Sequence, residues 1–297
     1  MKPKLPKRKR LLRGCGILIV VVLLLIYIVL PAAFGAAAIW PENDDTGDPP
    51  DGFSEVTLTT SDDVKLAAWY APPTNGAAII LVHGAGSGRQ SVKGYAEMLR
   101  DNGFGVLAIS TRGFSDSEGS INRYGWQGTV DVGAAVAYLQ SQPDVQTIGG
   151  LGISMGGEIL LGAASDYPQI QAIISDGATF RSLEEYKALP ANRSLWRNFT
   201  SRVLYLSVRI LSGDTPPKPL LDAMLDAKDT HFLYIAAGDD DTEVEFNERF
   251  LDQVGEDRAE LWVVPDVGHT DGFNKHREDY EAQVVAFFET HLVSETP

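Results

Sequence analysis

Residues 146–164 read QTIGGLGISMGGEILLGAA, and this stretch decides the fold of the chain. Its first seven residues predict a strand, and Met155–Ala164 predicts a helix. Between them, Gly152-Ile153-Ser154-Met155-Gly156 matches the pattern G-x-S-x-G, in which a serine occupies a sharp strand-to-helix turn with its hydroxyl exposed. Gly152 and Gly156 suit that turn because it is strained and its backbones crowd together. A glycine-rich turn without chemistry is the alternative, but a strand and a helix flank the motif where a nucleophile requires them.

Short apolar runs alternate with segments of helical spacing over the rest of residues 53–297. Ala77–Val82 is an unbroken apolar run, as expected for a strand buried on both faces. This alternation predicts an α/β fold with a mainly parallel, twisted sheet flanked by helices. Further strands are expected at 56–60, 64–70, 105–110, 170–175, 232–237 and 260–264, and helices at 91–102, 129–140 and 279–291.

Residues 178–230 interrupt this rhythm, because they are too many for an ordinary connection between strands. Trp196, Phe199, Val203, Leu206 and Ile210 fall at helical spacing within the segment and give one apolar stripe. One interpretation is a helix packed on the core. The other is a helical cap whose stripe lines an apolar pocket over an active site.

A second glycine-rich segment, His83-Gly84-Ala85-Gly86-Ser87-Gly88, follows the strand at 77–82. It lacks the Lys-Ser/Thr of a phosphate-binding P-loop and the spacing of a dinucleotide fingerprint. The segment instead suits an oxyanion hole, in which the backbone N–H groups of Ala85 and Met155 face the oxygen that becomes negative in the transition state. His83 is then expected to hold the loop in place, with Gly84 beside it.

A serine nucleophile needs a base, and the base needs an orienting acid. Among five histidines, His269 is the strongest candidate because it directly follows the last predicted strand. The acid is expected in the aspartate run Asp239-Asp240-Asp241 after the strand at 232–237, although such a run is usually a solvated loop. Asp176, after the strand at 170–175, is a weaker alternative.

The order of these motifs resembles the α/β-hydrolase superfamily, which runs Ser, then Asp or Glu, then His. HGAGSGR at 83–89, Arg112-Gly113-Phe114, GISMGG at 152–157, G-x-x-D-x-x-V at 238–244 and Gly268-His269 all fall in the expected order. The chain is most similar to the serine-aminopeptidase-like group of membrane-anchored bacterial hydrolases. Glu245 departs from the proline that the group often carries there, and Arg112–Ser117 departs from its usual R-G-x-G-x-S loop.

The resemblance implies an α/β-hydrolase fold with a helical cap insertion at about 178–230 and a catalytic triad of Ser154, Asp241 and His269. Asp241 is selected because it is the fourth residue of the G-x-x-D pattern. The implied reaction is cleavage of an ester, thioester or amide through an acyl-enzyme, with no metal or cofactor. A peptidase of the serine-aminopeptidase type and a non-catalytic, membrane-tethered binding protein on the same scaffold are the alternatives.

The charge of the chain is divided between two regions. Residues 1–40 carry seven basic residues and no acid, whereas the remaining residues carry 18 bases and 40 acids, a net charge of −22. An acidic body argues against nucleic-acid binding, because phosphate would be repelled. The single cysteine, Cys15, rules out an intrachain disulfide and a cysteine-based metal site.

The N-terminal residues predict a membrane segment. A basic arm at 1–13 precedes 27 uncharged residues, Gly14–Trp40, which are long enough to span a bilayer. The positive charges should stay cytoplasmic, which places the hydrolase domain, 53–297, on the extracytoplasmic side. A cleavable signal peptide, followed by secretion, is the alternative. The acidic, proline-rich segment 41–52 is expected to be a solvated linker.

Overall fold

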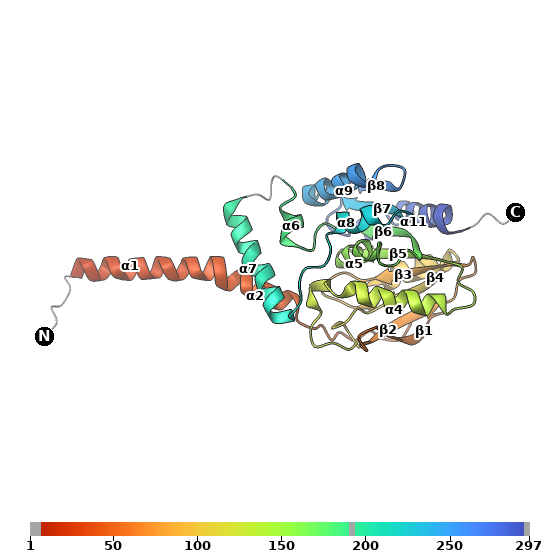
Figure 1. Cartoon of the computed structure of the whole chain (residues 1–297), viewed down its shortest axis with the longest axis horizontal. Coiled ribbons are helices and arrows are strands. Elements are labelled where there is room, and N and C mark those ends of the chain that lie inside the picture. Colours follow the sequence, from red (N-terminus) through yellow and green to blue (C-terminus); the bar gives the residue numbers. More distant parts are fainter. Residues whose placement is uncertain (1–6, 190–193, 294–297) are drawn as a thin grey trace.

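In the computed structural model, an eight-stranded sheet lies between helices, and a long N-terminal helix projects away from it (Figure 1). The structure describes residues 7–189 and 194–293. The strands are β1 (Ser54–Thr59), β2 (Lys65–Ala71), β3 (Ala77–Val82), β4 (Gly105–Ile109), β5 (Thr147–Ile153), β6 (Ile170–Asp176), β7 (His231–Ala237) and β8 (Ala259–Val264).

The sheet has the strand order β1-β2-β4-β3-β5-β6-β7-β8. β1 and β2 pair antiparallel, as do β2 and β4, and every pairing from β4 to β8 is parallel. The mainly parallel sheet is confirmed, and each expected strand is present within two residues of its predicted bounds. The strands at the centre form because their side chains are apolar in succession, as in β3, where all six residues are buried.

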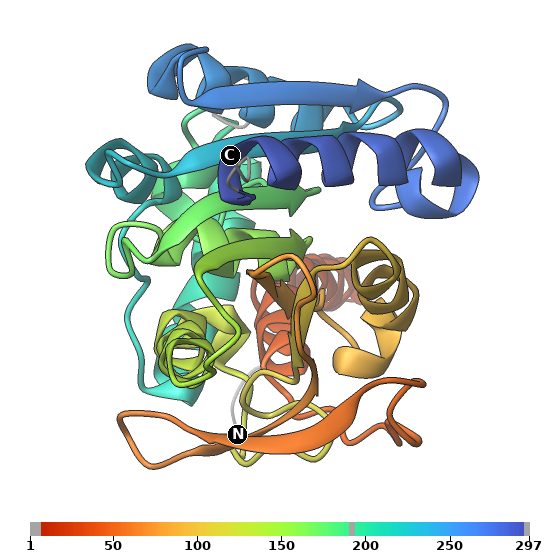
Figure 2. The same cartoon turned by 90° about the vertical axis from the view of Figure 1, so that its right-hand side faces the viewer.

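Helices cover both faces of this sheet, and Figure 2 shows them beside the stacked strands. One apolar core joins the sheet to α4, α5, α8 and α9, and a second joins its other face to α3 and α11. The helices are α1 (Lys7–Leu24), α2 (Leu30–Ala38), α3 (Lys93–Asp101), α4 (Gly128–Gln140), α5 (Met155–Ala163), α6 (Leu183–Tyr186), α7 (Leu195–Ser212), α8 (Leu220–Asp226), α9 (Asp241–Val254), α10 (Gly272–Lys275) and α11 (Arg277–Leu292). A π-helical turn, η1 (Leu25–Val29), joins α1 to α2, and η2 (Arg89–Val92) and η3 (Arg123–Gly125) are 3-10 turns.

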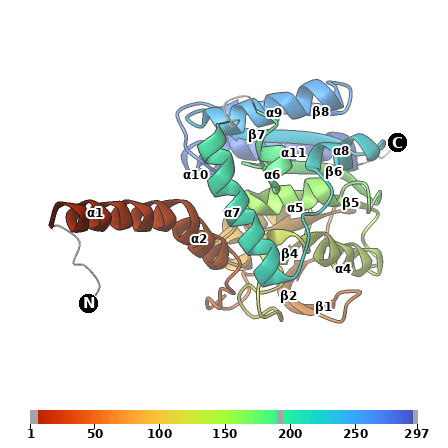
Figure 3. The same cartoon turned by 60° about the vertical axis from the view of Figure 1, so that its left-hand side comes forward.

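The long N-terminal helix bends at η1, as Figure 3 shows. Pro31 explains the bend, because proline lacks the N–H that would bond to the carbonyl of Tyr27 and its ring crowds that carbonyl. The helical stretch Arg8–Ala38 is long and apolar enough to be a membrane anchor or a signal sequence, and 6% of its most apolar window is buried.

The apolar stripe of α7 is not a contact with the core, which was one of the two interpretations made from the sequence. Four of its residues, Trp196, Phe199, Leu206 and Ile210, are exposed. The opposite face of α7 is the buried one and contains Tyr205, Val208 and Ser212. Helical periodicity identified the stripe correctly, but it cannot specify which apolar surroundings the stripe meets.

The segment after α2 is not a free linker, in contrast to the expectation for residues 41–52. The N–H of Glu42 donates to the carbonyl of Gly113 at 3.0 Å, and Asn122 bonds the carbonyls of Ile39 and Trp40 at 3.1 Å. These backbone contacts fix the end of the N-terminal helix against the loops that follow β4.

Candidate active site

Ser154 occupies the strained turn between β5 and α5. Its φ of +52° is in the left-handed region, which non-glycine residues seldom adopt. A Cβ atom added at Gly152 would overlap the backbone of Gly156, and one added at Gly156 would overlap the carbonyl of Val82. The glycines are therefore required for β5, α5 and the end of β3 to approach one another this closely, and the turn exposes the Ser154 hydroxyl at the carboxyl ends of the strands.

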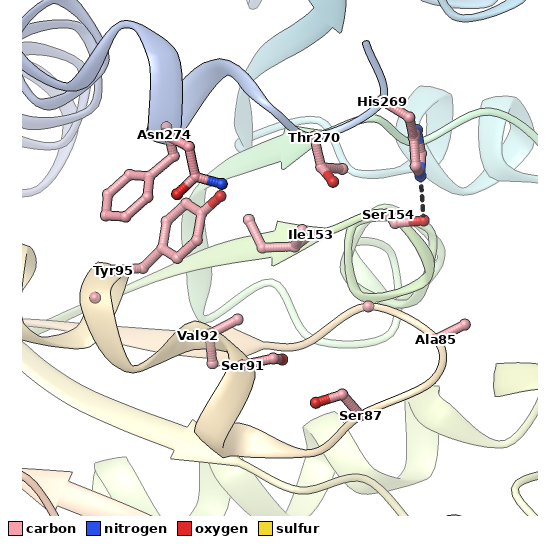
Figure 4. Close-up of a pocket in the computed structure, with 13 residues that line it drawn as sticks. Ala85, Ser87, Ser91, Val92, Tyr95, Ile153, Ser154, His269, Thr270 and Asn274 are labelled. Atoms are coloured by element: carbon pink, nitrogen blue, oxygen red, sulfur yellow. Dashed lines mark hydrogen bonds between the residues drawn. The ribbon is translucent and has the colours of Figure 1, made fainter.

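His269 lies in the loop after β8 and faces Ser154 (Figure 4). Its Nε2 is 2.9 Å from Ser154 Oγ, which is hydrogen-bonding distance. The two residues are 115 positions apart in the chain, and the parallel sheet brings them to the same edge. The structure thus places together the serine and the histidine selected from the sequence.

The carboxylate that contacts His269 belongs to Glu243, and not to Asp241 as the sequence analysis expected. Glu243 Oε1 accepts a hydrogen bond from His269 Nδ1, and its Oε2 accepts one from the N–H of Ala237 at 2.9 Å. The Glu243 residue is 1% exposed. Asp241 is the first residue of α9 and is exposed to solvent, which is why its side chain is not the one at the histidine.

The position of Glu243 follows from the way α9 begins. Asp240 caps the helix by accepting hydrogen bonds from the N–H groups of Thr242 and Glu243. The buried face of α9 then contains Glu243, Phe246, Asn247, Phe250 and Val254, at the three- and four-residue spacing of one helix face. This spacing is visible in the sequence and is the signal for Glu243. A run of three aspartates is typical of a solvated loop, however, and does not by itself indicate that α9 begins there.

Asp176, the alternative acid, lies at the end of β6 and is 2% exposed. Its Oδ2 accepts a hydrogen bond from the hydroxyl of Tyr280 at 2.9 Å. The pKa of Asp176 is raised to about 7, mainly by burial; the Tyr280 hydrogen bond opposes the rise and the charge of Glu243 contributes to it. Asp176 therefore contributes a buried carboxyl group behind the histidine rather than its direct partner.

The electrostatic surroundings of His269 favour its protonated form. The hydrogen bond to Glu243 raises the pKa of His269, partial burial opposes this, and the charges of Glu243, Asp176 and Asp240 add to the increase. An imidazole in these surroundings accepts a proton from Ser154 more readily than a solvated one.

His83 holds the glycine-rich loop, as expected from the sequence. Its side chain is fully buried, its Nδ1 donates to the carbonyl of Gly84 at 2.7 Å, and its Nε2 accepts from the N–H of Thr111 at 3.1 Å. Burial lowers the pKa of His83 to about 4, so the ring is neutral at physiological pH. Its role is to hold the loop through these two backbone hydrogen bonds.

Two cavities open from Ser154. The first, of about 420 Å³, is lined by the loop at Gly84 and Ala85 together with Ser154, His269 and Tyr95 (Figure 4). The second, of about 360 Å³, has different walls, formed by the residues Ala37, Ala38, Glu42, Ala85, Gly86, Asn122, Tyr124, Ser154, Met155 and Glu158. Ser154 and Ala85 belong to both cavities, so a substrate with two arms can place one arm on each side of the serine.

Glu158 is the ionisable group of the second cavity that is closest in sequence to Ser154, one turn further along α5. Burial raises the pKa of Glu158 to about 8, and the nearby charge of Glu185 raises it as well. The carboxyl is therefore mostly neutral at pH 7, which keeps this wall compatible with an uncharged substrate arm. Across the described residues, no group of three or more His, Cys, Asp and Glu side chains is arranged to hold a metal ion.

Comparisons with known proteins agree with this fold. Residues 73–230, more than half of the chain, match the family model of serine aminopeptidase S33, and the chain belongs to this family of α/β hydrolases. It is a serine hydrolase-like enzyme. It is similar to the Mycobacterium tuberculosis protein Rv2307c, with 28% identity over 73% of this chain and 72% of the relative.

Two further similar proteins are named for hydrolytic activities. The chain is 33% identical to thiohydrolase aneE of Aspergillus aculeatus over 129 residues, which is 41% of each chain. The Pyrococcus furiosus esterase Pf2001 has a similar fold, with a TM-score of 0.69, 21% identity, and coverage of 86% of this chain and 98% of that one.

Proposed function

We propose that this enzyme cleaves a carboxylic ester or thioester through Ser154, His269 and Glu243. The observation that carries the proposal is the 2.9 Å contact between His269 Nε2 and Ser154 Oγ at a strained turn, with the buried Glu243 on the other ring nitrogen. This arrangement has the three roles of a serine-hydrolase triad, with glutamate as the acid. The similarity of the chain to a thiohydrolase and to an esterase supports an acyl substrate.

In the proposed reaction, Ser154 Oγ attacks the carbonyl carbon while His269 Nε2 takes the hydroxyl proton. Glu243 keeps the Nδ1 proton in place and stabilises the imidazolium. The N–H groups of Ala85 and Met155 bind the oxyanion, a type of contact worth about 3–4 kcal/mol in the transition state. His269 then gives its proton to the leaving oxygen or sulfur, and water activated by the same histidine releases the acyl group as a carboxylic acid.

The lining of the first cavity favours an uncharged acyl substrate over a peptide amino terminus. An ammonium group needs a carboxylate partner, and the residues that line this cavity include polar groups such as Ser87, Ser91 and Asn274 but no Asp or Glu. Aminopeptidase activity, which the family description names, is the alternative to be tested beside esterase activity.

The first experiment tests the nucleophile. Ser154→Ala should lose labelling by a fluorophosphonate probe, whereas Ser165→Ala, in the turn that follows α5, should keep it. Retained labelling of Ser154→Ala at the wild-type rate would remove Ser154 from the mechanism. A panel of p-nitrophenyl esters, an acyl thioester and aminoacyl nitroanilides then separates esterase, thioesterase and peptidase; turnover of the nitroanilides alone would contradict the proposed substrate class.

The proposed location is a membrane, with Arg8–Ala38 as an uncleaved anchor and the hydrolase domain on the extracytoplasmic side. The basic residues that precede the uncharged segment Gly14–Trp40 support this orientation. A cysteine introduced as Asp48→Cys, in a Cys15→Ser background, should react with a membrane-impermeant maleimide in intact cells. A mature N-terminus near Ile39 by mass spectrometry would contradict the anchor.

A further inference from the structure

The exposed face of α7 requires a second apolar environment besides the protein core. Leu195, Trp196, Phe199, Leu206 and Ile210 lie along one side of this helix with relative exposures of 85%, 68%, 43%, 54% and 69%. Since the opposite side of α7 is already buried in the domain, the exposed stripe is not the helix's attachment to the core. A contiguous row of large apolar side chains on the surface of a domain marks an interaction site.

This stripe continues the apolar surface of the N-terminal helix. The rings of Tyr27 and Trp196 are 5.3 Å apart. Further along, the two backbones touch: a Cβ atom added at Gly35 would lie 2.8 Å from the carbonyl oxygen of Leu204. α2 and α7 therefore pack through a small residue, as helices do in membranes, and Figure 3 shows them side by side.

The contact with Tyr27 fixes how deep α7 would lie in a bilayer. About 20 residues cross the hydrocarbon core as a helix, and the uncharged segment begins at Gly14. Tyr27 is thirteen residues further along and so lies within the apolar layer on the side of the domain. Trp196, which touches it, reaches the same layer, so the start of α7 enters the membrane beside the anchor.

The charge of α7 also suits a lipid surface. Beyond the depth of Trp196, α7 carries two exposed arginines, Arg202 and Arg209, and the whole helix has no acid, within a domain that is otherwise strongly acidic. Basic residues beside a Trp-, Phe- and Leu-rich face are typical of helices that lie in the membrane interface, where arginine meets anionic headgroups. The chain thus places its cationic helix where the lipid would be.

The membrane-facing helices also form a wall of the catalytic site. Ala37 and Ala38, at the end of α2, line the second cavity together with Ser154. The backbone bonds of Ile39, Trp40 and Glu42 to the loops after β4 hold this wall in place. A molecule that leaves the bilayer along the end of α2 would therefore arrive at the cavity that contains the nucleophile.

We propose that the exposed face of α7 is embedded, together with the anchor, in the leaflet on the side of the hydrolase domain, and that the substrate is an acyl lipid drawn from this leaflet through the cavity beside α2. The substrate class is an amphiphile whose ester or thioester carbonyl lies near the headgroup level, where Ser154 can meet it. This inference rests on the proposed hydrolase function for its substrate, but not for its account of α7.

The membrane position of α7 can be measured without any activity. In a Cys15→Ser background, Phe199→Cys and Leu206→Cys are labelled with an environment-sensitive dye, and the full chain is reconstituted in phosphatidylcholine–phosphatidylglycerol vesicles containing nitroxide-labelled lipid. Both dyes should be quenched, whereas a dye at Glu260→Cys on the exposed edge strand β8 should not be. Unquenched dyes on α7, whether open to water or covered by a second copy of the chain, would overturn the proposal.

The substrate source is tested by rates. The variant Leu206→Gln/Ile210→Gln should hydrolyse an acyl ester embedded in vesicles about tenfold more slowly, because its interfacial face is polar, while hydrolysing water-soluble p-nitrophenyl acetate as fast as wild type. Val263→Gln, an exposed apolar residue of β8, is the matched control and should change neither rate. Ser154-dependent hydrolysis of the soluble ester but not of the vesicle ester by wild type would overturn the lipid source.

These outcomes separate the two proposals. If neither ester is hydrolysed but the α7 dyes are quenched, the hydrolase function fails and the membrane contact stands. If both esters are hydrolysed equally by wild type and by the α7 variant, and the dyes are unquenched, the hydrolase function stands and the membrane contact fails.

Discussion

Replacing Glu243 by glutamine should remove most of the activity with little effect on the fold, because the structure dictates which way the new amide must face. Glu243 Oε2 accepts a hydrogen bond from the N–H of Ala237 at 2.9 Å in a buried position. An amide nitrogen there would oppose that donor, so the glutamine oxygen must take this place and its NH₂ must face His269 Nδ1. The histidine would then have to accept at Nδ1 and carry its proton on Nε2, which points at Ser154.

A histidine in that tautomer cannot take the proton of Ser154, so we expect kcat to fall by about 10⁴-fold, which is the size of effect known for an amide in place of a triad acid. This corresponds to about 5.5 kcal/mol of lost transition-state stabilisation. The matched control is Asp241→Asn, two residues away on the exposed side of α9. It should keep kcat within about twofold and lose at most about 1 kcal/mol of stability from the first turn of the helix.

The assay is kcat on a soluble p-nitrophenyl ester, measured for the full chain, with active sites counted by fluorophosphonate titration and folding checked by circular dichroism. A folded Glu243→Gln that keeps more than a tenth of the wild-type kcat would refute the assignment of the acid. Loss of activity in Asp241→Asn with an active Glu243→Gln would restore the acid expected from the G-x-x-D pattern.

Three further predictions concern the same site and its support. Since a general base works only when unprotonated and Glu243 raises the pKa of His269, kcat/KM should fall as the pH drops through a value above the ordinary histidine pKa; an acid limb centred below that ordinary value would contradict this. Gly156→Ala should fail to fold or lose several kcal/mol of unfolding free energy in urea titrations, because its Cβ would overlap backbone; a change under about 0.5 kcal/mol would show that the elbow has room. Asp131→Asn should lower the free energy of unfolding by about 3–5 kcal/mol, because the buried guanidinium of Arg112 loses the buried carboxylate that lies 2.7 Å away. The measurement is urea titration, and the control is Glu97→Gln, which removes an exposed ion pair worth at most about 1 kcal/mol.

Most of the sheet could be predicted from the sequence because its central strands are buried on both faces. A strand such as β3 must then be apolar at every position, and such runs are recognisable without any knowledge of the neighbours. Ser154 and His269 could be predicted for a related reason, since each directly follows a recognisable strand and the carboxyl ends of parallel strands meet at one edge.

The acid could not be predicted in the same way, because the choice among neighbouring carboxylates depends on where α9 begins. Moving from Asp241 to Glu243 turns the side chain by more than half a helical turn, from solvent to the sheet. The surroundings of the apolar stripe of α7 could not be predicted for a different reason. Its period predicts a helix with an apolar face, but the same period serves a core contact, a pocket wall and a membrane contact, and only the packing of the other face distinguishes them.

The packing of α2 bears on whether the N-terminal segment is a signal peptide or an anchor. A peptidase that cut before Ile39 would remove Pro31 and Gly35, whose buried side lies against α7, and would leave the backbone at Leu204 without its partner. It would also remove Ala37 and Ala38 from the wall of the second cavity beside Ser154. A leader that is cut off would leave this cavity without one of its walls, whereas a permanent anchor would keep the wall in place. The shared wall therefore favours an uncleaved helix that serves both as the membrane attachment and as part of the substrate site.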